Sequence, residues 1–277
     1  MYIPHHVKNI LRLALEEDVG ISDITTTLLI PEGERAKALL VAKGSFIMAG
    51  MPFVQEVFAL VDPQTQFRIY FCEGSRTTKG DIIAEIAGNT RALLSCERVG
   101  LNVLQRLSGI ATLTNLFVEK MKGLNVKIVD TRKTTPGLRF IEKYAVRTGG
   151  GSNHRFGLFD GILIKDNHLE AAGGITAAVA SARRAHHLSK IEVEVENLNE
   201  LNEALAAGAE VVMLDNMSLD DMKEAVRLAR GKAILEASGN MTLERVRDVA
   251  ETGVNLISVG ALTHSAPAAD ISMKIVR

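Results

Sequence analysis

Residues 190–215 read KIEVEVENLNELNEALAAGAEVVMLD, and this stretch decides the fold. Apolar runs at 190–196 and 210–215 flank a segment whose apolar residues recur at spacings of three and four. That pattern predicts two β-strands joined by one α-helix. Strands separated by a single helix run parallel with a right-handed crossover, so the stretch predicts one unit of a parallel sheet.

The same alternation extends from about residue 124 to residue 260. Further strands are predicted at 125–130, 160–166, 232–238 and 255–260, and further helices at 176–188, 218–231 and 242–253. Repeated strand–helix units favour an α/β fold with an incomplete TIM-like (β/α) barrel. An open doubly wound sheet is the main alternative, but it more usually carries a Gly-rich fingerprint in its first turn, where this chain has DTRKTTPG at 130–137.

The first hundred residues have a different pattern. Short strands interrupted by glycine are predicted at 36–50, 65–74 and 79–88, followed by a helix from about Leu93. We therefore expect an N-terminal α+β open sandwich domain over residues 1–110. A barrel catalytic domain is expected over 111–265, with the C-terminal segment 266–277 joining the first domain.

The overall composition excludes several classes of protein. A net charge of -1 over 277 residues argues against a nucleic-acid partner, and no apolar run is long enough for a membrane span. The N-terminus lacks the pattern of a secretory signal. Cys72 and Cys96 are too far apart for a disulfide framework or a CxxC metal site, so we expect a cytoplasmic location. The adjacent pairs His5–His6 and His186–His187 are predicted to be surface groups.

Polar and glycine-rich residues follow every predicted strand of the second half. They are DTRK at 130–133, KDNH at 165–168, the run holding Glu194 and Glu196, DN at 215–216, ASGN at 237–240 and SVG at 258–260. Helix capping and turns can explain any one of these strand ends. Six together predict a site, because the loops that follow barrel strands open onto one rim.

The charges expected at this rim indicate the ligand. The basic candidates are Arg132, Lys133, His154, Arg155 and Lys165, and the acidic candidates are Glu194 and Asp215. Arginine and lysine in this number predict a multiply charged anion. The two acids would repel an anion unless each contacts a hydroxyl group or Mg²⁺, directly or through water. A phosphate-bearing sugar satisfies both requirements, and backbone N–H groups at 238–240 and 258–260 would hold its phosphate.

Five blocks carry a resemblance to a known family. They are DTRKTTPGLRFIEKYAVRTGGGSNHRFGLFDGILIKDNHL at 130–169, EVEVEN at 192–197, MLDNM at 213–217, EASGN at 236–240 and ISVGALTHSAPAADIS at 257–272. In this order they resemble the quinolinate phosphoribosyltransferase family over nearly the whole chain. The resemblance implies transfer of phosphoribose from phosphoribosyl pyrophosphate to quinolinate. The expected products are nicotinate mononucleotide, pyrophosphate and CO₂, and Mg²⁺ is the expected cofactor.

The resemblance also implies a role for each matching residue. The quinolinate carboxylates would contact Arg132, Lys133, His154 and Arg155, and Lys165 would lie between the substrates. Thr131 would also bind substrate. Glu194 and Asp215 would face the ribose hydroxyls or the metal and would favour positive charge at C1. Lys133, Lys165, Glu194 and Asp215 are the residues expected to be catalytic. The 5′-phosphate would lie against Ser238, Gly239, Asn240, Ser258, Val259 and Gly260, near His264. Arg98 would enter the site of a neighbouring subunit, which makes a homodimer, possibly within a higher oligomer, the expected assembly.

Three alternatives remain open at this point, and a fourth is disfavoured. A related phosphoribosyltransferase would keep the phosphate cradle and change the base pocket. A barrel aldolase would use Lys133 or Lys165 as a Schiff-base amine. A sensor of NAD precursors would bind the same ligands without turnover. A lipoyl- or biotinyl-carrier hairpin is suggested by KGDIIAEIAG at 79–88, but no lysine occupies its tip.

Overall fold

The computed structural model describes residues 2–185 and 189–276 and divides into two compact units. The first comprises Met1–Asn115, Thr134–Gly150 and Thr263–Arg277, and the second comprises Leu116–Lys133 and Gly151–Leu262. The segment Thr134–Gly150 was expected in the barrel domain, whereas its contacts group it with the first unit. The predicted surface pair His186–His187 lies outside the described residues.

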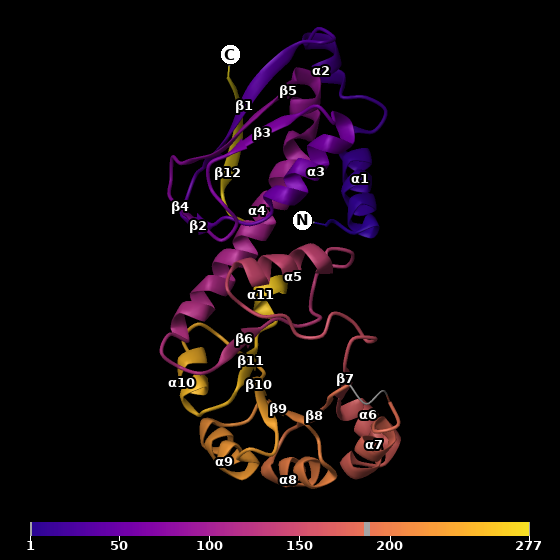
Figure 1. The fold of residues 1–277 in the computed structure, drawn as a ribbon, viewed down its shortest axis with the longest axis vertical. Coiled ribbons are helices and arrows are strands. Elements are labelled where there is room, and N and C mark those ends of the chain that lie inside the picture. The colour runs from indigo at the N-terminus through magenta and orange to yellow at the C-terminus, as the bar shows by residue number, and fades with distance from the viewer. Residues whose placement is uncertain (1, 186–188, 277) are drawn as a thin grey trace. The chain divides into compact units, whose positions relative to one another are not determined.

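The first unit contains an antiparallel sheet of four strands in the order β12-β1-β5-β3 (Figure 1). Their bounds are β12 Ile271–Val276, β1 Arg35–Ala42, β5 Ile82–Asn89 and β3 Gln66–Ile69. A two-stranded ladder joins β2 (Phe46–Ile47) to β4 (Arg76–Thr77). The C-terminal strand thus completes a sheet built mainly from the first ninety residues. This arrangement confirms the expected α+β fold class.

Helices fill the rest of the first unit. They are α1 His5–Val19, α2 Ile24–Leu29, α3 Met51–Val61, α5 Arg139–Thr148 and most of α4 Thr90–Lys120. The backbone of α4 comes very close to the C-terminal segment, because a Cβ atom at Gly109 would lie 2.0 Å from the carbonyl oxygen of Pro267. Helix α5 was not predicted, although its buried face includes Ile141, Ala145 and Val146.

The second unit is built on a parallel sheet in the order β6-β11-β10-β9-β8-β7. The strands are β6 Lys127–Val129, β7 Ile162–Ile164, β8 Ile191–Val195, β9 Val211–Asp215, β10 Ile234–Ser238 and β11 Leu256–Ser258. All six predicted strands are therefore confirmed. Beyond β6, Ser152 forms a parallel bridge with Val129, so a short stretch of the loop before β7 extends the sheet.

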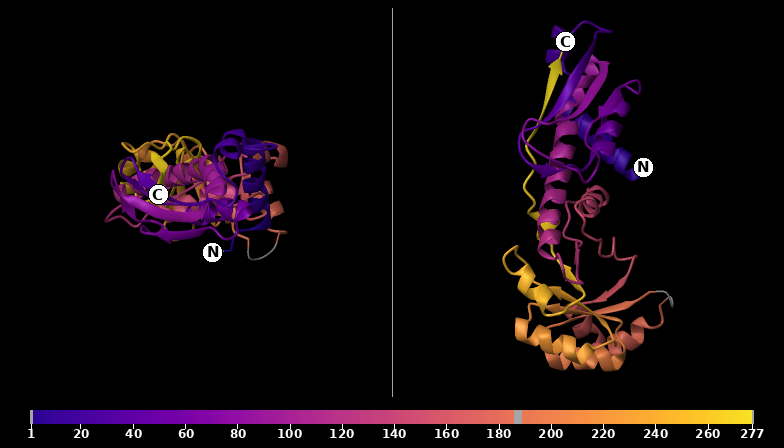
Figure 2. Two further views of the ribbon diagram at one scale, coloured as in Figure 1. Left: turned by 90° about the horizontal axis from the view of Figure 1, so that it is seen from above. Right: turned by 60° about the vertical axis from the view of Figure 1, so that its left-hand side comes forward.

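Helices follow the strands and pack along one side of this sheet (Figure 2). They are α6 Asp166–Ala172, α7 Ile175–Ala182, α8 Leu198–Ala207, α9 Leu219–Ala229 and α10 Val246–Glu251, with α11 Ala261–His264 after β11. The side chain of Asn197 caps α8 and that of Ser218 caps α9. Capping therefore accounts for these two polar residues. No helix in the described part of the chain is long and apolar enough to cross a membrane.

The strand register places the carboxyl ends of neighbouring strands side by side. Ser258 pairs with Val129, Ser238 with Asp215, and Ile164 with Val193. Successive residues of a strand face opposite sides of the sheet, so Glu192 and Glu194 share one face of β8. The residues expected at the rim are therefore carried by one edge of one sheet.

Candidate active site

The clearest ionic contact at this edge joins two of the expected catalytic residues. Lys165 follows β7 and is the N-cap residue of α6, and its ammonium group donates to Oε2 of Glu194 on β8. The Lys165 side chain is 43% exposed and that of Glu194 14% exposed. A partly exposed ammonium group oriented by a more buried carboxylate is available to an anionic ligand.

Two arginines of the predicted site lie near each other. Burial lowers the pKa of Arg155 below its ordinary value, and the positive charge of Arg132 lowers that pKa further. The Arg155 guanidinium donates to the carbonyl oxygen of Gly161 at 2.9 Å, which fixes its direction. A half-buried arginine beside a second, exposed cation favours binding of an anion.

The loop after β6 is shaped by its own side chains. Oγ1 of Thr131 accepts the N–H of Lys133 at 3.0 Å, which forms a tight turn at Arg132. Asp130 is fully buried, and its carboxylate accepts the Nδ2 amide of Asn153 at 2.6 Å and the N–H of His154 at 2.9 Å. The charged residues after this strand therefore have two roles. Buried Asp130 holds the loop at Asn153 and His154 by hydrogen bonds, whereas Arg132 and Lys133 are exposed.

The turns after β9 and β10 adopt unusual backbone conformations. Asn216 and Asn240 have φ angles of 52° and 46°, and Gly239 has a φ of 93°. The Nδ2 amide of Asn240 donates to Oδ1 of Asn216 at 3.1 Å. A Cβ atom at Gly239 would lie 2.2 Å from the same oxygen. Strained backbone of this kind is concentrated at functional sites.

Asn216 was predicted only as part of a polar strand end. Its side-chain amide also donates to Oδ2 of Asp215 at 2.9 Å, so it links the acid on β9 to the turn after β10. Ser238 precedes that turn and is half-buried. On the other side of β10, the N–H of Val259 donates to the carbonyl oxygen of Val129 at 2.9 Å.

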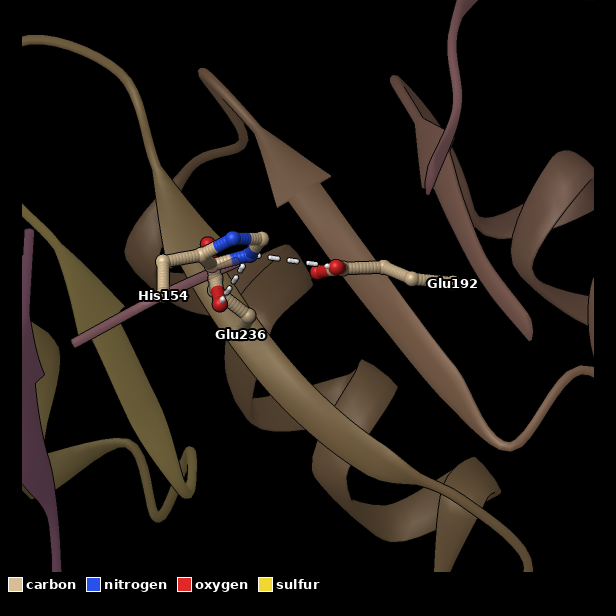
Figure 3. Close-up of side chains that lie close together, drawn as sticks. All are labelled: His154, Glu192 and Glu236. Carbon is tan, nitrogen blue, oxygen red and sulfur yellow. Dashed lines mark ion pairs between the residues drawn. The ribbon is translucent and has the colours of Figure 1, made fainter. Parts of the chain in front are cut away.

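The predicted site residue His154 lies in a second cluster of charged side chains, and its two acidic partners were not predicted. Nε2 of His154 lies 3.1 Å from Oε2 of Glu192 on β8 and 3.5 Å from Oε2 of Glu236 on β10 (Figure 3). Burial and the charge of Glu192 raise the pKa of Glu236 to about 7, and the nearby His154 opposes this increase. The alternation of β8 gave a signal for Glu192, because it shares a face with Glu194.

This cluster lines a cavity of about 520 Å³. The other lining residues include the first residues of four strands, Lys127, Ile162, Val211 and Leu256. The cavity therefore extends toward the amino ends of the strands, below the edge that carries Lys165 and Glu194.

Two groups of side chains could be considered for a metal ion. Glu194 and Asp215 offer carboxylate oxygens near the carboxyl ends of neighbouring strands, which is the donor set that Mg²⁺ prefers. The atoms of His154, Glu192 and Glu236 lie within 4.8 Å of one another. However, Nδ1 of His154 accepts the N–H of Arg155 at 2.8 Å, which places the ring proton on Nε2 and leaves that nitrogen no lone pair for a metal.

The remaining expected residues belong to the first unit. Arg98 is exposed on α4, and His264 is exposed at the end of α11 with its Nδ1 2.6 Å from Oγ of Ser265. The other expected site residues lie in the second unit.

Comparisons with known families give two matches that cover most of the chain. Residues 23–108 match the model described as "Quinolinate phosphoribosyl transferase, N-terminal domain". Residues 110–274 match the corresponding C-terminal domain.

Similar proteins agree with these matches. The chain is 48% identical over 270 residues to a "Probable nicotinate-nucleotide pyrophosphorylase [carboxylating]" of Bacillus subtilis, covering 97% of this chain and 93% of that protein. It is 46% identical to a protein of the same description from Synechocystis, covering 95% and 90%. The solved structure of the nicotinate-nucleotide pyrophosphorylase from Francisella tularensis has a TM-score of 0.95 and 43% identity, covering 99% of this chain and 98% of that one.

Proposed function

The chain belongs to the quinolinate phosphoribosyltransferase family, and from this membership we propose that it converts quinolinate and phosphoribosyl pyrophosphate to nicotinate mononucleotide, pyrophosphate and CO₂. The reaction is that of a pentosyltransferase in the de novo synthesis of NAD.

One observation carries the proposal beyond family membership. The edge that bears Arg132 and Lys133 also bears Arg155 and the Lys165–Glu194 pair, and the two arginines are close enough for Arg132 to lower the pKa of Arg155. One substrate is a dicarboxylate and the other carries three phosphate groups. A cluster of cations in a protein of net charge -1 suits these ligands better than it suits a neutral base.

The chemistry consists of two balanced steps. The ring nitrogen of quinolinate donates its lone pair to C1 of phosphoribosyl pyrophosphate while the C1–O bond breaks, and the electron pair of that bond leaves with pyrophosphate. The ring nitrogen is then cationic. The C2 carboxylate leaves as CO₂, its bonding electron pair remains at C2, and C2 takes a proton from water.

The protein's contribution to these steps is binding and electrostatic stabilisation. Arg132, Lys133 and Arg155 orient the quinolinate carboxylates, and Lys165 stabilises the negative charge on departing pyrophosphate. The carboxylates of Glu194 and Asp215 favour the positive charge that develops at C1. Bound Mg²⁺, held by Glu194 and Asp215 directly or through water, would neutralise phosphate charge. No side chain acts as a covalent nucleophile.

The turn at Ser238, Gly239 and Asn240 and the segment Ser258, Val259 and Gly260 are the proposed cradle of the 5′-phosphate, with His264 nearby. The left-handed backbone at Gly239 and Asn240 supports this assignment, because such turns direct successive N–H groups toward one point.

The working assembly in this proposal is a homodimer, alone or as part of a higher oligomer. Arg98 is an exposed arginine on a helix that also carries the core of the first unit, and in the dimer it enters the partner's site. The substrates are small molecules, with no nucleic acid or membrane among the partners. The proposed location is the cytoplasm, where both cysteines, Cys72 and Cys96, remain free thiols.

A turnover assay tests the proposed reaction. The protein is incubated with quinolinate, phosphoribosyl pyrophosphate and Mg²⁺, and nicotinate mononucleotide and CO₂ are both measured. We expect equal amounts of the two products. Turnover of nicotinate in place of quinolinate, without CO₂, would assign the chain to a related transferase. Borohydride trapping with a carbonyl substrate tests the aldolase alternative, and we expect no covalent label on Lys133 or Lys165.

A further inference from the structure

His154 is held from two sides of the second unit. Its main-chain N–H donates to the buried Asp130, which follows β6, while its ring reaches Glu192 on β8 and Glu236 on β10. In Figure 3 the ring lies against the carboxylate of Glu236 with that of Glu192 beyond Nε2. The His154 side chain is 14% exposed, and those of Glu192 and Glu236 are 10% and 0% exposed. His154 therefore contacts residues in or directly after three strands, below the edge of the sheet that carries Lys165 and Glu194.

The two ring nitrogens of His154 have distinct partners. Nδ1 accepts the N–H of Arg155 at 2.8 Å, so the proton of a neutral ring is on Nε2. Nε2 then lies 3.1 Å from Oε2 of Glu192 and 3.5 Å from Oε2 of Glu236. A metal ion on Nε2 would require the opposite tautomer, and Nδ1–H would then face the N–H of Arg155. The geometry fits an ionic network around the ring, because neither side-chain oxygen of Glu236 has a hydrogen-bond partner among the described residues.

The network also controls Arg155. The peptide N–H that meets the His154 ring belongs to Arg155, and the guanidinium of the same residue donates to Gly161 at 2.9 Å. Rotation of the His154 ring would remove the acceptor of that N–H and free the main chain at Arg155. Because Glu192 and Glu236 come from rigid strands, they can fix the ring where a solvent-exposed loop could not.

We propose that Glu192 and Glu236 are positioning residues, which lock the His154 ring in its Nε2–H tautomer and thereby hold Arg155 in the orientation that binds quinolinate. The part that concerns quinolinate rests on the function proposed above. The part that concerns the tautomer does not depend on that function.

Nitrogen NMR of the wild-type protein tests the tautomer directly. The protein is labelled with ¹⁵N-histidine, and His154→Gln assigns the ring signals of His154 among the seven histidines. We expect an unprotonated Nδ1 and a protonated Nε2 at neutral pH, unchanged when Zn²⁺ is added. A protonated Nδ1, or loss of the Nε2–H signal on addition of Zn²⁺, would overturn the network and indicate a metal site instead.

Kinetics of substitutions at Glu192 test the link to Arg155. Glu192→Gln keeps an oxygen that can accept Nε2–H, whereas Glu192→Leu removes the acceptor at similar size. For Glu192→Leu we expect about a tenfold rise in the KM for quinolinate, the size of one lost hydrogen bond to a charged group. The KM for phosphoribosyl pyrophosphate should stay at its wild-type value, and Glu192→Gln should recover most of the lost affinity.

The control is Glu17→Leu, which changes an exposed acid on α1 of the first unit. A purely structural role for Glu192 would lower kcat in both Glu192 variants and leave the KM for quinolinate unchanged, and that result would contradict the proposal. If the wild-type protein fails to turn over quinolinate, the proposed function is wrong, but the NMR result still decides the network. The NMR measurement also decides it if Glu192→Leu does not fold.

Discussion

Arg155 is the single residue whose surroundings explain most about its role. It is half-buried, its guanidinium is directed by Gly161, and the charge of Arg132 lowers its pKa. An arginine kept beside a second cation has a free-energy cost in the absence of a ligand, and a bound dicarboxylate removes that cost. Lysine at the same position would supply the charge without the planar pair of donors.

We predict that Arg155→Lys weakens quinolinate binding selectively. Loss of charge-assisted hydrogen bonds costs about 1.5–3 kcal/mol, which corresponds to a roughly 10- to 150-fold rise in the KM for quinolinate. The KM for phosphoribosyl pyrophosphate should change little. Arg227→Ala removes an exposed arginine that pairs with Glu224 and serves as the control. An unchanged KM for quinolinate in Arg155→Lys would contradict the assignment of Arg155.

Glu236 predicts a dependence of stability on pH. Its pKa is raised from 4.5 to about 7, mainly by burial, so the native state retains a proton that the unfolded chain has lost between these values. The native state is therefore destabilised as the pH rises from about 4.5 through 7, by on the order of 3 kcal/mol when the change is complete.

Glu236→Gln should abolish this part of the pH dependence, because glutamine does not ionise. Unfolding free energies of the two proteins, measured in denaturant between pH 5 and pH 8, should differ most at the alkaline end, where the variant is the more stable. Parallel curves over this range would show that Glu236 is ionised in the native state.

At the scale of elements, the turns after β9 and β10 show why particular residues are needed. Gly239 has a positive φ, and a Cβ atom there would overlap Oδ1 of Asn216. Gly231, in the turn before β10, also has a positive φ, but a Cβ atom there would meet nothing within 4 Å. Substitutions at the two glycines therefore share the backbone strain, but only a substitution at Gly239 adds a clash with Asn216.

We predict that Gly239→Ala raises the KM for phosphoribosyl pyrophosphate at least tenfold, because Asn216 and the proposed phosphate cradle must move apart. Gly231→Ala carries a similar backbone cost of about 1–2 kcal/mol and should lower the melting temperature without changing either KM. Equal kinetic effects of the two substitutions would mean that the turn after β10 does not contact the phosphate.

At the scale of the whole molecule, the proposal places Arg98 of one subunit in the site of its partner. Arg98 belongs to the first unit, and Lys165 belongs to the second. If a dimer exchanges Arg98 between subunits, a mixed dimer of one chain lacking Arg98 and one chain lacking Lys165 carries both substitutions in the same site. One of its two sites then contains neither substitution.

Mixing Arg98→Ala with Lys165→Ala chains should therefore restore activity. After unfolding and refolding together in equal amounts, half of the dimers are mixed and each has one intact site, so about a quarter of wild-type activity is expected from a two-fold symmetric pair. Each variant alone should be nearly inactive. Activity that stays at the level of the separate variants would show that Arg98 acts within its own chain.

Much of the second unit could be predicted from the sequence. All six strands were found, because a parallel strand is buried on both faces and reads as a short apolar run between helical segments. The strand ends were informative because the parallel topology brings the carboxyl ends of these strands to one edge of the sheet. Helix α5 was missed, because its ten residues lie inside a long connection rich in charged residues and glycine between two strands.

Glu192 and Glu236 mark the limit of prediction from sequence. When a strand is buried on both faces, its apolar pattern does not say which residues face the helices and which face the opposite side of the sheet. The sequence alone therefore determined the order of strands and helices and the cations at the strand ends. Only the tertiary structure decided that His154, Glu192 and Glu236 meet, because their contact depends on the register of strands that lie far apart along the chain.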